Sequence, residues 1–66
     1  MEYAKEELLE AKRQIDSTVH KLEETARTLE AKEDPRRYRS QITLAKRRIK
    51  AFTIAGELLG RELDRL

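Results

Sequence analysis

The pair Asp34-Pro35 decides the fold, because it contains the only proline of the chain. Aspartate is favoured just before a helix, and proline is favoured in the first turn, where its missing N–H costs nothing. Proline also disfavours the α conformation in the residue before it. We therefore expect a helix over about 2–32, a turn at 33–34 and a second helix over about 35–65. So short a connection makes the helices antiparallel neighbours, which predicts one all-α domain, an antiparallel two-helix hairpin.

On both sides of this turn, residues suited to helix packing recur at alternating spacings of three and four, which predicts one coiled-coil-like seam between the helices. In the first half the seam residues are Ala4, Leu8, Ala11, Ile15, Thr18, Leu22, Thr25 and Leu29. In the second half they are Tyr38, Ile42, Ala45, Ile49, Phe52, Gly56, Leu59, Leu63 and Leu66. Folding the chain at residue 34 should then place Ala11 opposite Gly56 and Leu22 opposite Ala45.

The second half carries a further apolar row outside this seam. The row comprises Leu44, Ala51, Ala55 and Leu58, and Ile54 widens it. A helix that is apolar on two sides is buried on two sides, and one partner helix cannot cover both. The chain has 66 residues and no cysteine, so association is the remaining common way to complete so small a core.

We therefore expect these five residues to form an oligomer interface. Two hairpins would assemble as a homodimer into a four-helix bundle, and a tetramer or a heteromeric partner helix would satisfy the same requirement. Gly56 and Gly60 form a GxxxG spacing inside the second helix. Because glycine weakens a helix, we expect them to mark a close helix crossing at the oligomer interface.

The residues around the turn are strongly basic, with seven bases and one acid over 34–50. The candidate binding residues for phosphates or for an acidic partner are Arg36, Arg37, Arg39, Arg47 and Lys50. Such a patch can bind nucleic-acid phosphates. The alternative is that acids of the first helix neutralise it. Tyr38 is the only aromatic residue among these bases and belongs to the seam, so base stacking has little support.

No arrangement of residues predicts catalysis or metal binding. The only histidine, His20, follows Asp16 by four residues on one helix face but points away from the seam. The glutamates near the start read as a solvated face, and neither serine has a nucleophile motif around it. We expect no enzyme activity, no cofactor, no metal and no small-molecule substrate.

The chain also lacks a predicted membrane segment. Its first residues contain neither the basic region nor the apolar region that a signal peptide has. The most apolar stretch, 51–60, is about half of the roughly 20 residues that a membrane span needs. The absence of cysteine suits the cytoplasm. The sequence predicts a small structural or interaction protein, an accessory or adaptor that self-associates; the alternative is a nucleic-acid-binding regulator that uses the basic patch.

Overall fold

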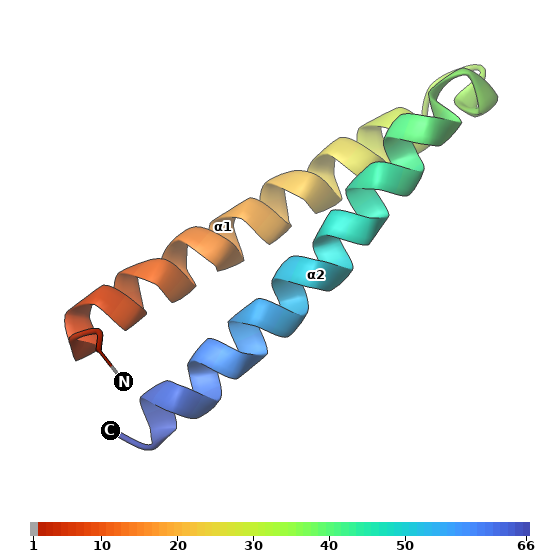
Figure 1. The fold of residues 1–66 in the computed structure, drawn as a ribbon. Helices are drawn as coiled ribbons and strands as arrows, with labels where there is room; N and C mark the ends of the chain where they lie inside the picture. The colour runs from red at the N-terminus through yellow and green to blue at the C-terminus, as the bar shows by residue number, and fades with distance from the viewer. Residues whose placement is uncertain (1) are drawn as a thin grey trace.

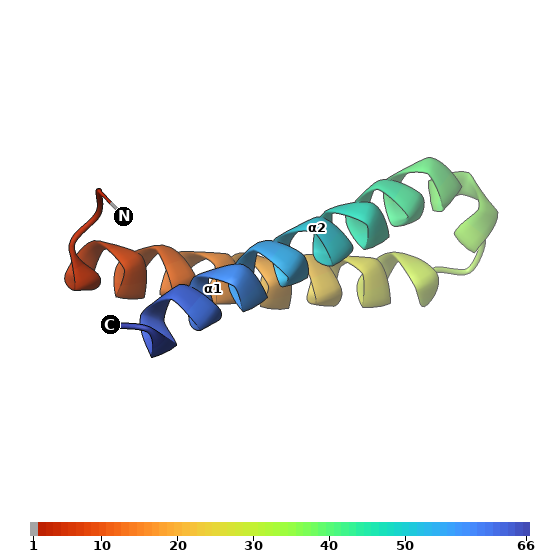
Figure 2. The same cartoon turned by 60° about the horizontal axis from the view of Figure 1, so that its bottom comes forward.

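The computed structural model describes residues 2–66 and contains two long helices joined by a short 3-10 helix. Helix α1 spans Lys5–Glu30, η1 spans Pro35–Tyr38, and α2 spans Arg39–Asp64. The long helices run antiparallel and bring both ends of the chain to one end of a rod (Figure 1). The rod measures 48 × 15 × 14 Å, and α2 crosses α1 at an angle (Figure 2). The predicted all-α hairpin is confirmed.

Helix α1 is shorter than predicted at both ends. At its start, the carboxylate of Glu7 accepts a hydrogen bond of 3.1 Å from the backbone N–H of Ala4. This bond satisfies an N–H that has no partner within the helix, and Glu7 also complements the positive end of the helix dipole. At the other end, the N–H of Lys32 donates to the carbonyl of Leu29 at 3.3 Å. The last turn therefore tightens before the chain leaves the helix.

The turn differs from the prediction in one respect that changes the packing. Asp34 does precede a helical turn, but its side chain makes no capping hydrogen bond. Instead its carbonyl accepts a hydrogen bond of 3.2 Å from the N–H of Arg37. The segment that begins at Pro35 is a 3-10 turn, and the α-helix begins only at Arg39.

Because this 3-10 turn belongs to the connection, the two helices are offset by about one turn from the predicted register. A Cβ placed on Gly56 would lie 3.5 Å from Cγ2 of Ile15 and 3.5 Å from Oδ1 of Asp16. Gly56 therefore faces Ile15, and the predicted pairing of Gly56 with Ala11 is wrong.

The seam in α1 also drifts from the predicted heptad. Thr18 and Thr25 are exposed, whereas their neighbours Val19 and Ala26 are half-buried and buried. The hydroxyl of Thr25 donates to the carbonyl of Lys21 at 3.0 Å, so it needs no partner across the seam. A straight helix has 3.6 residues per turn and rotates by about 20° per heptad against a 3.5-residue pattern. That rotation moves the contact line from the threonines to Val19 and Ala26.

In α2 the predicted seam holds for the most part. Ala45 and Gly56 are buried, and Ile42, Ile49, Leu59 and Leu63 are half-buried, whereas Phe52 is exposed. Only three apolar side chains of residues 2–66 are buried, those of Leu8, Ala26 and Ala45. The core is therefore one thin seam between two helices. Within residues 2–66, neither long helix has a stretch apolar enough to cross a lipid bilayer.

Candidate interaction surfaces

Helix α2 presents three different faces. One face packs on α1 through the seam. A second carries the apolar row, defined as Leu44, Ala51, Ala55 and Leu58, which recurs at spacings of seven, four and three and so forms one stripe. A third carries the basic stripe, defined as Arg39, Thr43, Lys46, Arg47 and Lys50.

The apolar row is open to solvent along most of its length. Leu44 is 46% exposed and Leu58 is 54% exposed. Between them Ala51 is exposed and Ala55 is half-buried. Leucine side chains of a small protein are usually buried, so two of them half-exposed on one stripe mark a face that the hairpin itself leaves uncovered.

A groove runs beside the row, between the two helices. Its α1 wall consists of Leu22, Thr25 and Leu29, and Leu44 forms part of its α2 wall. Leu22 and Leu29 are only half-buried, since one side of each faces this groove. Gln41 and Arg48 also line the groove, so the row and the leucines of the groove form an apolar surface that these two polar side chains border. The prediction assigned Leu22 and Leu29 only to the seam; the drift of a 3.6-residue helix is the signal that could have revealed their second role.

Of the five predicted interface residues, Ile54 is the one that lies outside the apolar row. It is 47% exposed and lines a shallow groove with Lys46, Arg47 and Lys50, which Ala51 also borders. Ile54 therefore lies on the edge between the apolar row and the basic stripe, and its apolar side chain forms part of a cationic groove.

The structure brings most of the predicted basic residues together along one line. Arg36 and Arg39 line one shallow groove that ends at Thr43, and Thr43 also borders the groove of Lys46, Arg47 and Lys50. Arg37 is separate, because it lies beside Tyr38 and the residues of the 31–34 connection.

Few of these bases are neutralised by acids of the hairpin. The Nζ of Lys46 lies 3.1 Å from Oε2 of Glu30, and the Nε of Arg36 lies 3.9 Å from Oδ1 of Asp34. Within residues 2–66, Arg39, Arg47 and Lys50 form no ion pair. The alternative that the first helix neutralises the patch therefore holds for Lys46 only. Lys46 is one of the seven bases around the turn but is not among the predicted binding residues; the structure places it in the groove of Arg47 and Lys50.

The two glycines face α1 and lie away from the apolar row. A Cβ on Gly60 would lie 3.6 Å from Cε of Lys12. The groove around Gly56 and Gly60 is lined by charged residues, including Lys12 and Asp16. The prediction that the GxxxG spacing marks an oligomer crossing is therefore corrected, because the close approach is between the helices of one hairpin.

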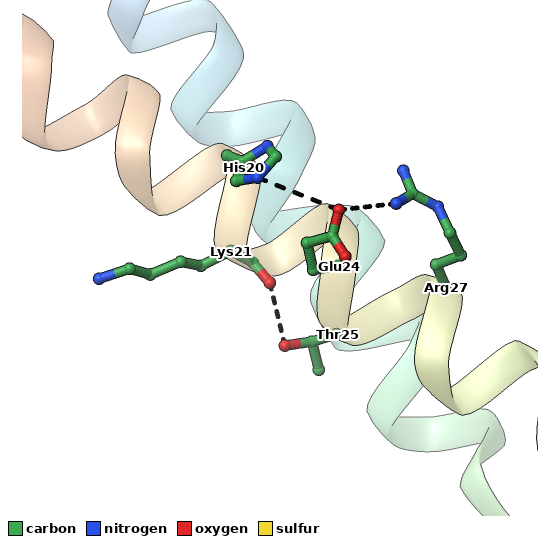
Figure 3. Close-up of polar contacts among 5 residues, drawn as sticks. All are labelled: His20, Lys21, Glu24, Thr25 and Arg27. Carbon is green, nitrogen blue, oxygen red and sulfur yellow. Dashed lines mark hydrogen bonds and ion pairs between the residues drawn. The ribbon is translucent and has the colours of Figure 1, made fainter.

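The surroundings of His20 are those of a solvated helix face (Figure 3). Its Nε2 lies 4.0 Å from Oε1 of Glu24, and the same carboxylate oxygen accepts a hydrogen bond of 2.7 Å from Nη1 of Arg27. Asp16 is engaged by Lys12, whose Nζ lies 3.0 Å from Oδ2. No three histidine, aspartate or glutamate side chains of the described chain, residues 2–66, gather as metal ligands.

The titration of Glu10 is perturbed by its neighbours on α1. Nε2 of Gln14 donates a hydrogen bond of 2.8 Å to it, and the guanidinium of Arg13 lies beside it. Both interactions favour the ionised form and lower the pKa of Glu10 below its usual value of 4.5. Glu10 is therefore a surface carboxylate that stays ionised near neutral pH.

Comparison of the chain with models of protein families, with curated proteins and with solved structures finds no match.

Proposed function

We propose that the protein is a self-associating helical hairpin that forms a four-helix bundle as a homodimer and acts, without catalysis, as an accessory or adaptor in the cytoplasm. The observation that carries the proposal is the exposed apolar row beside the groove of Leu22 and Leu29. In a four-helix bundle this surface of each hairpin would form the core. In a dimer, each hairpin covers the apolar row of the other. Association of two such dimers would give a tetramer.

The surface area of the hairpin supports the proposal. Its accessible surface is 5485 Å², whereas a compact monomer of 7.8 kDa exposes about 4,400 Å². The excess of roughly 1,100 Å² is of the size that one partner covers in a standard interface, about 800 Å² per copy. One further copy of the hairpin, bound through a standard interface of about 800 Å² per copy, would therefore cover most of this excess.

The proposal is tested by light scattering of the protein at micromolar concentration. We expect a mass of twice 7.8 kDa. A folded, helical monomer would refute the proposal. The unfolding temperature of the dimer should also rise with protein concentration, because association stabilises only the folded state.

A matched pair of variants locates the interface. Leu58→Glu places a charge on the apolar row, where Leu58 is exposed in the single hairpin. Leu9→Glu makes the same change at a leucine that is 43% exposed, on the stripe of Lys12 and Asp16 beside the other groove. We expect Leu58→Glu to weaken the dimer by about 3 kcal/mol or more, since two leucines leave the interface. Leu9→Glu should retain the dimer, and equal effects would refute the assignment of the row.

The unpaired bases of the basic stripe favour a second function, binding of a nucleic-acid duplex through its phosphates. Arg39, Arg47 and Lys50 face away from the seam and form no ion pair within residues 2–66. Lysine and arginine contacts to phosphates release counterions, so such binding weakens steeply with salt. Fluorescence anisotropy of labelled RNA and DNA duplexes across a salt series tests this function.

A further inference from the structure

The apolar row of α2 has an arrangement that is symmetric about Ala51. Leu44 precedes Ala51 by seven residues, and Leu58 follows it by seven. If a second α2 ran antiparallel across the row with Ala51 on a twofold axis, Leu44 would meet the partner's Leu58. The small Ala51 would meet the partner's Ala51. Two large contacts would then flank a small one, which lets the helix axes approach closely.

The position of Ala51 within α2 allows the longest overlap. Helix α2 spans Arg39–Asp64, and Ala51 lies at its middle. A twofold axis there places the start of one helix beside the end of the other, so the whole length of both helices is in contact. The same axis would bring Ala55 beside the partner's Arg47, whose aliphatic stem can cover an alanine while its guanidinium stays in water.

The charge of the hairpin differs between its two ends. Residues 17–55, which form the half of the rod next to the turn, carry ten bases and five acids. The other half, 2–16 and 56–66, carries five bases and eight acids. An antiparallel partner places each basic half beside an acidic half. A parallel partner places the two basic halves together, and like charges within about 10 Å repel at physiological salt.

The groove beside the row fits the same partner. Leu44 lies at its edge, with Leu22 and Leu29 on the opposite wall. In the antiparallel arrangement the partner's Leu58 arrives next to Leu44 and so reaches the mouth of this groove. Leu58 is 54% exposed in the single hairpin, so its side chain is free to enter the groove of the partner.

We infer that the partner on the apolar row is a second copy of this chain, docked antiparallel with Ala51 on the twofold axis; this inference rests on the self-association proposed above. The arrangement places one basic stripe toward each end of the assembled rod. A dimer therefore presents two separate cationic surfaces.

Single cysteine variants test the arrangement, because the chain has no cysteine of its own. Ala51→Cys should form a disulfide-linked dimer on mild oxidation, since residues on the axis can satisfy the Cα separation that a disulfide needs. Leu44→Cys and Leu58→Cys should cross-link poorly when oxidised alone and efficiently when mixed. Thr53→Cys, an exposed position that lines the other groove, is the control for random collision. Cross-linking at Ala51 should exceed the control by on the order of 1,000-fold, as expected when an effective concentration near millimolar replaces a micromolar one.

The outcomes separate orientation from association. Leu44→Cys that cross-links to itself better than to Leu58→Cys would show a parallel dimer and overturn the inference. A dimeric mass without cross-linking of Ala51→Cys would overturn the register while leaving the proposed self-association intact. A monomeric mass of the unmodified protein would refute self-association itself, and the inference with it.

Discussion

Lys46 and Glu30 form the one ion pair that joins α1 to α2 within residues 2–66, with Nζ 3.1 Å from Oε2. Both side chains are about half-exposed, so the pair contributes little to stability. Its main consequence concerns the basic stripe. One base of that stripe is partly neutralised, whereas Arg39, Arg47 and Lys50 keep their full charge.

The basic stripe predicts a specific salt dependence of nucleic-acid binding. Replacing both Arg47 and Lys50 with alanine should reduce the slope of log affinity against log salt by about 2, because each phosphate contact contributes about 0.9. The measurement is anisotropy of a labelled duplex at several salt concentrations. The control is the double variant Lys5→Ala with Lys21→Ala, which removes the same charge from α1 and should change the slope far less.

Two results would contradict this prediction. A chain that binds neither duplex at about 50 mM salt lacks the phosphate-binding function, since electrostatic binding is strongest at low salt. Equal effects of the two double variants would mean that only the net charge matters and that the stripe on α2 is no site.

Gly56 predicts a stabilising substitution. Gly56→Ala adds a Cβ whose nearest neighbours, Ile15 and Asp16, would lie at 3.5 Å, an ordinary van der Waals distance. Alanine favours the helix over glycine by about 1 kcal/mol. We therefore expect the unfolding temperature, followed by circular dichroism at fixed concentration, to rise by roughly 4–8 °C.

Gly60→Ala provides a comparison, because its new Cβ would meet only the flexible end of Lys12, at 3.6 Å. It should stabilise the helix similarly. A lower unfolding temperature for Gly56→Ala together with a higher one for Gly60→Ala would mean that the helices approach more closely at Gly56 than the structure has them.

A larger side chain at Ala26 should lower the stability of the hairpin, because Ala26 is only 5% exposed within the seam. Ala26→Leu forces a larger side chain between the helices and should destabilise the protein by about 1–3 kcal/mol in chemical denaturation. Thr28→Leu, a change at an exposed position of the same helix, should alter the free energy of unfolding by less than about 0.5 kcal/mol. If Ala26→Leu were as well tolerated as Thr28→Leu, the seam would follow the heptad through Thr25 instead.

Local features of the sequence determine much of this fold. Asp34-Pro35 ends the first helix because proline restricts the residue before it, and the regular apolar spacing on both sides favours two helices. The apolar row of α2 is also readable from spacing alone, because residues three, four and seven apart share one helix face. The exposure of Leu44 and Leu58 in the hairpin agrees with that interpretation.

The register of the two helices and the exact seam were decided only by the tertiary structure. The 3-10 turn at Pro35–Tyr38 lengthens the connection, and this moves Gly56 from Ala11 to Ile15. The rotation of a straight helix moves the contact from Thr25 to Ala26. The register is set by contacts between residues far apart in the sequence, such as Gly56 and Ile15, whereas a helix and its end depend on neighbours within a few residues. For the same reason, the sequence by itself determined that the second helix carries an apolar row and a cluster of bases on different faces, and only the packed hairpin decided that α1 leaves the leucines of that row exposed.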